Sequence, residues 1–165
     1  MNFRSLSDIH RSSFAGFQSL RRLSADPGLL PDIRGVYLVL NPAGTKPAFL
    51  AVGSGGFFKG KDPNISLEDL EANWVEGTIV LYIGKAGGSG SKATLRSRLK
   101  PYLDFGQGKN APHWGGRLIW QLENAGDLLL CWKPLPAEEP RKVEKDLIGQ
   151  FIAEYGKRPF ANLKA

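Results

Sequence analysis

The chain has 165 residues, with 22 Lys or Arg against 16 Asp or Glu, and its formal net charge is +6. This length suits one domain with its own hydrophobic core. No stretch approaches the roughly 18–20 apolar residues of a membrane span, and the first residues lack the apolar run of a secretory signal. Cys131 is the only cysteine, so we expect no intrachain disulfide and a cytoplasmic location.

The first part of the chain predicts a helix followed by a hairpin. Residues 5–24 carry apolar side chains at helical spacing, and the turn-rich segment 26–32 ends that helix. Residues 1–32 are therefore expected to form a helical extension. The β-branched and aromatic residues 33–40 predict a strand, with 48–53 as its hairpin partner.

Later segments predict one capped helix, three further strands and two longer helices. Ser66 and Asp69 form an expected capping box for a short helix over 66–75. Strands are expected at 78–86, 117–122 and 128–135, the last two joined by a hairpin turn. Helices are expected at 92–103 and 138–156. Pro101 should kink or end the first of these, while Pro140 and Gly156 mark the start and end of the second. The order of elements predicts an α+β domain with a small mixed or antiparallel sheet flanked by helices.

Charge is distributed unevenly along the chain. Residues 85–117 contain seven Lys or Arg and one acid, Asp104. Residues 62–76 contain five acids and no base. The basic region suits a polyanionic partner such as DNA. The acidic segment would be repelled by phosphates, so we expect it to lie away from DNA or to contact a second protomer in a homodimer.

One carboxylate stands among the apolar side chains of the last predicted helix. At about 100° per residue, Glu144 falls in the middle of the apolar face that runs from Val143 to Ile152. An unpaired buried carboxylate is costly. Glu144 is therefore either the partner of a buried Arg or a functional residue, such as a metal ligand or an acid–base group.

The glycine-rich stretch 82–102 does not match a known phosphate-binding loop. It lacks the spacing of a Walker A motif, and it contains no G-x-G-x-x-G. Residues 87–91 are expected to form a flexible surface loop. In the helix that follows, Arg98 borders the apolar stripe that contains Leu95 and Leu99, so its side chain can reach inward.

These residues resemble the motifs of the GIY-YIG nuclease family. Gly35-Val36-Tyr37 matches the first tripeptide and Tyr82-Ile83-Gly84 the second. The residues that match the rest of the pattern follow in order: Lys85, Arg98, Tyr102, Glu144 and Asn162. The resemblance covers residues 33–163 and implies the nuclease fold over 33–165. The 45 positions between Tyr37 and Tyr82 depart from the compact pattern. An insertion at about 41–77 is more similar to the restriction-endonuclease branch.

The resemblance implies a role for each matching residue. Glu144 is implied as the sole protein ligand of one Mg²⁺ or Mn²⁺ ion. Tyr37 is implied to activate or position the attacking water, with Tyr82 beside it, and nearby cations are expected to favour the phenolate. Arg98, assisted by Lys85, is implied to bind the scissile phosphate. Tyr102 is implied to orient groups near Arg98, and Asn162 to shape the site from the C-terminal tail.

Six further residues are candidates for contacts with DNA: Lys92, Arg96, Lys100, Lys109, His113 and Arg117. Each candidate also has a simpler interpretation. Tyr37 and Tyr82 suit a β-sheet by residue type alone, and the basic residues suit a solvated surface. A loop histidine beside a tryptophan, such as His113, is more often structural.

The sequence thus predicts a metal-dependent endonuclease that hydrolyses DNA. Two alternatives from other classes remain open. One is an inactive nucleic-acid-binding module of the same fold. The other is a protein that binds a partner through its acidic segment 62–76.

Overall fold

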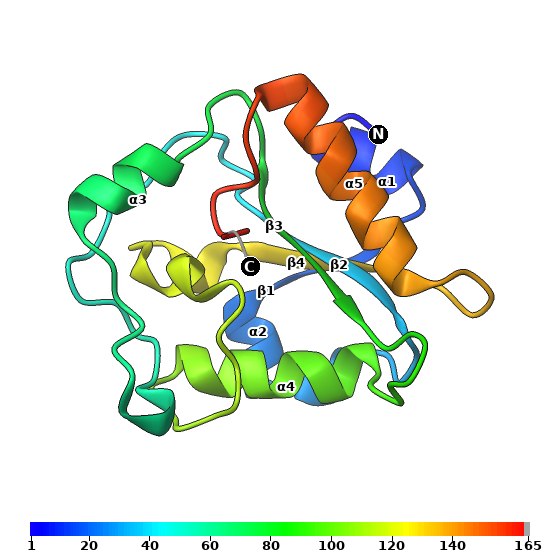
Figure 1. Ribbon diagram of the computed structural model, residues 1–165, viewed down its shortest axis with the longest axis horizontal. Coiled ribbons are helices and arrows are strands. Elements are labelled where there is room, and N and C mark those ends of the chain that lie inside the picture. The colour runs from blue at the N-terminus through cyan, green and yellow to red at the C-terminus, as the bar shows by residue number, and fades with distance from the viewer. Residues whose placement is uncertain (164–165) are drawn as a thin grey trace.

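A four-stranded antiparallel sheet in the order β1–β4–β2–β3 forms the centre of the computed structural model, which describes residues 1–163 (Figure 1). The strands are β1 (Ala15–Ser19), β2 (Gly35–Leu40), β3 (Val80–Ala86) and β4 (Leu129–Pro134). The helices are α1 (Leu6–Arg11), α2 (Leu20–Ala25), α3 (Leu67–Asn73), α4 (Leu95–Gly106) and α5 (Pro140–Tyr155). Short 3₁₀ helices are η1 (Pro27–Leu29), η2 (Phe58–Gly60), η3 (Arg117–Gln121) and η4 (Ala125–Asp127). The predicted α+β class is confirmed.

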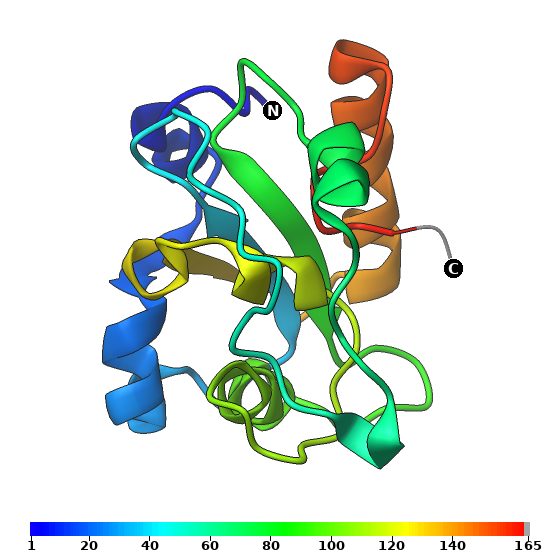
Figure 2. The ribbon, with the colours of Figure 1, turned by 90° about the vertical axis from the view of Figure 1, so that its left-hand side faces the viewer.

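Strand β2 divides the interior into two cores because its side chains alternate between the two faces of the sheet. Tyr37 and Val39 join the core formed with α2, α4 and η3. Val36, Leu38 and Leu40 join the core formed with α1 and α5. Figure 2 shows α4 nearly end-on and α5 running alongside β3.

The predicted helix over 5–24 is wrong: the segment forms α1, β1 and α2 in turn. Helix α1 stops where Ser13 adopts a positive φ of 68°. At Gly16, φ is 95°, and a Cβ atom there would collide with the indole ring of Trp132 on β4. Only glycine lets β1 pass so close to that ring. Residues 1–32 therefore add a strand to the sheet, and they are not a purely helical extension.

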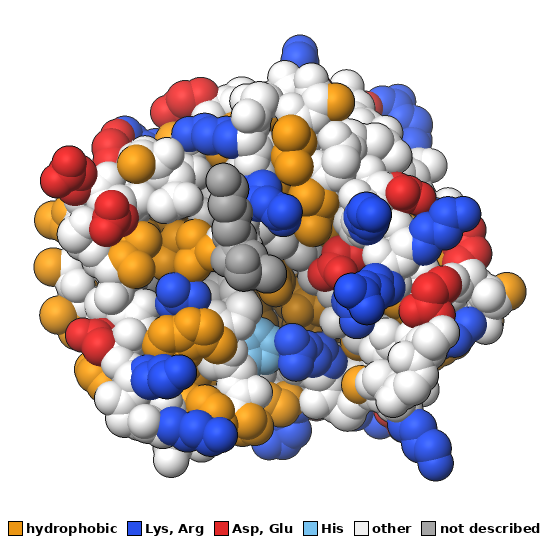
Figure 3. All heavy atoms as spheres, viewed as in Figure 1, with side chains coloured by type: hydrophobic (Ala, Val, Ile, Leu, Met, Phe, Trp, Pro, Cys, Tyr) orange, Lys and Arg blue, Asp and Glu red, His pale blue; other side chains and the backbone are white. Residues whose placement is uncertain are grey.

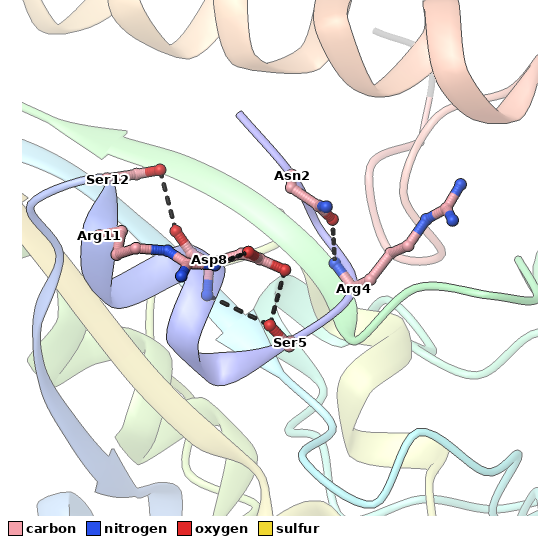
Figure 4. A network of polar contacts seen from close by, with 6 residues as sticks. All are labelled: Asn2, Arg4, Ser5, Asp8, Arg11 and Ser12. Carbon is pink, nitrogen blue, oxygen red and sulfur yellow. Dashed lines mark hydrogen bonds and ion pairs between the residues drawn. The ribbon is translucent and has the colours of Figure 1, made fainter.

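A polar cluster fixes the start of α1 (Figure 4). The Ser5 hydroxyl accepts a hydrogen bond from the Asp8 amide at 3.2 Å and donates one to the Asp8 carboxylate at 2.6 Å. The Arg11 guanidinium pairs with the same carboxylate. Arg4 forms an ion pair with Glu154 of α5 at 3.0 Å, so the N-terminal segment is tied to α5 as well as to the sheet.

The strands predicted at 48–53 and 117–122 are also wrong. Residues 117–121 form η3, and the 48–53 segment contributes only an isolated bridge between Phe49 and Leu122. Strand β4 has β1 on one side and β2 on the other, so the sheet offers 117–122 no free edge beside it. The two segments bond to each other instead, for example through the Leu50 amide and the Gln121 carbonyl at 2.8 Å. The insertion at 41–77 thus packs on η3.

The predicted helices at the other positions are confirmed with shifted ends. Helix α4 begins at the Thr94–Ser97 capping box and continues past Pro101 to Gly106, so the proline does not end it. The Ser66 hydroxyl caps α3 by accepting from the Asp69 amide at 3.0 Å. Helix α5 runs from Pro140 to a left-handed Gly156, with φ of 74°. Within residues 1–163, none of the helices is both long and apolar enough to cross a lipid bilayer.

Candidate active site

A polar pocket of about 250 Å³ lies where the end of β3, the start of α4 and the start of α5 meet. Five of the seven predicted catalytic side chains line it: Tyr37, Tyr82, Lys85, Arg98 and Glu144. These residues come from β2, β3, α4 and α5 and span more than 100 positions of sequence. Figure 3 shows the hollowed face between α4 and α5, with Lys and Arg side chains around it and an acidic side chain among them.

The glycines of the two tripeptides have identifiable steric roles. Gly84 on β3 lies opposite Tyr37 on β2, and a Cβ atom on Gly84 would collide with the end of the Tyr37 ring. Because Gly84 has no side chain, the Tyr37 ring can lie across β3 and reach the pocket. A Cβ atom on Gly35 would collide with the Lys133 carbonyl of β4. Both glycines therefore let Tyr37 be held between two close neighbouring strands.

The Tyr37 and Tyr82 rings lie together at the base of the pocket. Their centroids are 6.0 Å apart, and the side chains are only 1% and 8% exposed. Burial raises the pKa of Tyr37 well above its usual value, and the nearby Arg98 charge only partly opposes this. Burial also raises the pKa of Tyr82, while the Tyr37 hydroxyl and Arg98 act to lower it. The cations therefore do not produce the expected phenolate in the protein alone, and both hydroxyls stay protonated at neutral pH.

Glu144 faces the pocket from the first half of α5. It is half-buried, and within residues 1–163 it makes no ion pair shorter than 4.0 Å. Burial raises the pKa of its carboxyl group, and the charges of Lys85, Arg98 and Arg141 partly oppose that shift. The simpler interpretation of Glu144 as the partner of a buried arginine is therefore not supported.

The pocket contains two cations, Lys85 and Arg98. Lys85 is half-buried on β3, whereas Arg98 is exposed near the start of α4. Arg98 acts electrostatically on Tyr37, Tyr82 and Glu144, which places its charge near the centre of the site. Two cations in one pocket suit the binding of an anion by Arg98 and Lys85.

Two predicted catalytic residues lie outside the pocket lining. Tyr102 is fully buried, and its hydroxyl donates to the Gly116 carbonyl at 3.1 Å. It therefore fixes the loop that packs on Tyr82. Asn162 accepts from the Ile83 amide at 2.9 Å and donates to the Ile83 carbonyl at 2.8 Å. Its amide pairs with the outer edge of β3, beside Tyr82, so Asn162 supports the site from behind.

The remaining basic candidates make varied contacts. Arg96 Nε donates to the Leu30 carbonyl at 2.9 Å, so Arg96 joins α4 to the N-terminal segment. Lys100 and Lys109 both pair with Asp104, at 2.8 and 3.4 Å. Lys92 is exposed in the loop before α4. Arg117 lies over the Trp114 ring, with its guanidinium carbon 4.5 Å from the ring centroid.

His113 lies in the interior, with 2% of its surface exposed, which does not suit a direct contact with DNA. Its ring packs on Tyr102 with the centroids 4.7 Å apart, and neither ring nitrogen has a hydrogen-bond partner among the described residues. Burial, together with the Arg98 charge, lowers the pKa of His113 from 6.5 to about 4. His113 is therefore a neutral neighbour of the site at pH 7.

This lowered pKa predicts a loss of stability on acidification. Between pH 6.5 and 4, His113 binds a proton in the unfolded chain but stays neutral in the folded protein. The free energy of unfolding therefore falls as the pH falls. The contribution is about 3 kcal/mol over that range. We expect urea unfolding of the His113→Gln variant to show a weaker dependence on pH than the wild type between pH 7 and 4.5. The exposed His10→Gln substitution is the control, and equal slopes for wild type and His113→Gln would contradict the assignment.

The loop 87–91 lies at the surface, as expected, and Glu139 binds it at the rim of the pocket. The Glu139 carboxylate accepts from the Ser89 amide at 3.2 Å and from the Ser89 hydroxyl at 3.2 Å. Glu139 lies 50 positions away, at the cap of α5. No sequence motif links Glu139 to Ser89, so this contact could not be predicted from the sequence.

The site suits a single hard cation held by one carboxylate. Within residues 1–163, no three His, Cys, Asp or Glu side chains converge on one point. Glu144 supplies a carboxylate without an ion pair, next to a pocket with room for water and a phosphate group. Mg²⁺ commonly keeps several waters and binds through one or two carboxylates plus substrate phosphates, so the residues present fit that ion.

Comparisons with family models, with curated protein sequences and with solved structures gave no match to this chain. Functional conclusions therefore rest on the motif residues and on the geometry of the pocket.

Proposed function

We propose that this protein is a metal-dependent endonuclease of the GIY-YIG type that hydrolyses DNA phosphodiester bonds. The observation that carries the proposal is the pocket itself. It places Glu144, which lacks an ion pair among the described residues, in the same pocket as Arg98, Lys85 and the hydroxyl groups of Tyr37 and Tyr82. The sequence alone predicts a catalytic role for each of these residues.

Each residue of the pocket has a separate role in the hydrolysis. Arg98 binds the scissile phosphate and stabilises the charge that grows on its oxygens, with Lys85 as a second cation. Tyr37 orients the attacking water through its hydroxyl group, which burial keeps protonated in the protein alone, and the proton that the water loses passes to solvent water. Glu144 holds Mg²⁺ or Mn²⁺, which when bound supplies Lewis-acid polarisation of the phosphate and charge neutralisation of the leaving oxygen.

The acidic part of the insertion lies apart from this pocket. Helix α3, which carries the exposed acids Glu68, Asp69 and Glu71, sits on the opposite side of Figure 1 from the junction of β3 and α4. Glu71 pairs with Lys46, another residue of the insertion. DNA at the pocket is therefore not repelled directly by α3.

The experiment is incubation of the protein with plasmid, single-stranded and branched DNA in Mg²⁺, Mn²⁺ or EDTA, followed by gel electrophoresis. We expect nicking or cutting of at least one DNA class with metal and none with EDTA. Sustained cleavage in EDTA would contradict the metal site. Salt-dependent binding without cleavage of any DNA would favour the alternative, an inactive nucleic-acid-binding module.

Removal of the Tyr37 hydroxyl separates catalysis from folding. The Tyr37→Phe substitution keeps the buried ring that lies over Gly84. Binding of DNA should stay within about twofold, while the single-turnover cleavage rate falls by about 10²-fold because the water loses an orienting group. An unchanged rate would show that the Tyr37 hydroxyl has no part in catalysis and that Tyr37 is a structural residue of the sheet.

A further inference from the structure

A cationic and aromatic surface lies at the far end of α4 from the pocket. We call it the ledge. It consists of residues 55–61 from the insertion together with Lys109, Trp114 and Arg117. Lys and Arg side chains gather beside hydrophobic ones over this part of the face in Figure 3. Arg98 is the fourth of the 12 residues of α4, so the end of the helix at Gly106, where the ledge begins, lies about 12 Å from it along the helix axis.

Close backbone contacts hold the insertion against α4 and the loop that follows it. The Gly56 amide donates to the Phe105 carbonyl at 2.8 Å. A Cβ atom on Gly56 would collide with the Lys109 carbonyl, and one on Gly55 would lie 3.0 Å from the Phe105 ring. The Phe105 ring in turn meets Trp114 edge-on, with the centroids 6.4 Å apart. The two parts of the ledge are therefore packed together, although they are distant in sequence.

Three charges of the ledge, on Lys59, Lys61 and Arg117, are available to an external anion, whereas Lys109 pairs with Asp104. Arg117 is held by the Trp114 ring and Lys59 by the Phe58 ring, 5.4 Å from its centroid. Neither cation, nor Lys61, has an ion pair within 4.0 Å among residues 1–163. The backbone turns sharply at Lys59, which adopts φ of 53° without being glycine. Such strained positions concentrate at functional segments.

Phe57 adds an exposed aromatic ring to these charges. It is 54% exposed, whereas Phe58 beside it packs on the core. An exposed ring among cations is the arrangement with which proteins bind single-stranded nucleic acid, because an unpaired base can stack on the ring while lysines hold its phosphates. In a fully paired duplex the base faces are stacked on one another, so no base is free to stack on the Phe57 ring.

We propose that the ledge binds unpaired nucleotides, with a base stacked on Phe57 and phosphates held by Lys59 and Lys61. The inference rests on the proposed function in taking DNA as the substrate. It adds a substrate class: duplex DNA that carries a single-stranded segment near the bond to be cut. The acid Asp62 beside the lysines offsets only part of their charge, because Lys59 and Lys61 outnumber it in this segment.

The test is fluorescence anisotropy with the whole protein in EDTA, which prevents metal-dependent turnover. The probes are a fully paired duplex and the same duplex with a single-stranded tail. We expect tighter binding of the tailed duplex, and a loss of about tenfold in its affinity for Phe57→Ala, with less than a twofold change for the paired duplex. Phe57→Trp should restore the affinity. Leu67→Ala, a change at another exposed apolar residue, is the control and should have no effect.

An equal effect of Phe57→Ala on both duplexes, or no effect on either, would overturn the proposal, as would a failure to bind either DNA. These outcomes are distinct from failure of the nuclease proposal. If the protein binds the tailed duplex through Phe57 but does not cleave any DNA, the ledge proposal stands and the nuclease proposal fails. If the protein cleaves DNA but Phe57→Ala does not change its affinity for either duplex, the nuclease proposal stands and the ledge proposal fails.

Discussion

Replacement of Arg98 by alanine is expected to lower the rate of DNA cleavage by about 10³–10⁵-fold, the range seen when an arginine that stabilises a phosphoryl-transfer transition state is lost. Arg98 is exposed, lines the pocket and makes no ion pair with the described residues, so its charge is free for a phosphate. Arg98→Lys should recover only part of the rate, because an ammonium group lacks the planar fork that binds two phosphate oxygens.

Arg96 gives a matched control on the same helix. Its guanidinium bonds to the carbonyls of Leu30 and Gly28, away from the pocket. Arg96→Ala should therefore lower the stability of the fold with little change in the cleavage rate of the folded protein. The measurement is single-turnover cleavage with saturating protein. Equal losses for Arg96→Ala and Arg98→Ala would show that general basic charge, and not Arg98 itself, drives the reaction.

Replacement of Glu144 by glutamine is expected to leave the melting temperature in EDTA unchanged or higher. Burial raises the pKa of Glu144, so the free energy of unfolding falls as the pH rises through that raised pKa and the carboxylate ionises. At neutral pH the ionised group is therefore a cost to the fold, which glutamine removes. Such a cost is a common feature of functional sites.

A structural role for Glu144, as the ion-pair partner of a buried cation, would give the opposite result, a large loss of stability. If it were the partner of a buried cation, its loss would cost about 3–5 kcal/mol, which lowers the melting temperature by about 10 °C in a domain of this size. Mg²⁺ should also stabilise the wild type more than Glu144→Gln, because only binding to the folded state shifts the equilibrium. Thermal unfolding of both proteins in EDTA and in Mg²⁺ measures both effects.

Five of the residues that the sequence predicted to be catalytic line one pocket, although several of the predicted helices and strands were wrong. Tyr37, Tyr82, Lys85, Arg98 and Glu144 were found because their types and order carry chemistry, and Glu144 also because it interrupts an apolar helix face. Their neighbours were harder to find. The tie between Glu139 and Ser89 spans 50 positions and depends on the meeting of two elements, which no local pattern records.

The errors in the fold have a common cause. Residues 117–122 have the composition of a strand, but β4 already has a partner on each side, so tertiary context overrides propensity. The helix predicted over 5–24 fails at Gly16, because the packing of that residue on Trp132 cannot be seen without the sheet. His113 is a candidate for contact with DNA by sequence alone, because a single histidine in a loop carries no sign of its burial.

The most direct test of the central claim is the metal dependence of cleavage by three proteins: wild type, Glu144→Gln and Glu154→Gln. Glu154 lies on the same helix as Glu144 but pairs with Arg4 at the surface, so its substitution controls for loss of charge on α5. We predict that wild type and Glu154→Gln cleave DNA in Mg²⁺ or Mn²⁺ and not in EDTA, and that Glu144→Gln has no detectable cleavage with either ion. Metal-dependent cleavage by Glu144→Gln at the wild-type rate would contradict the assignment of this pocket as a nuclease site.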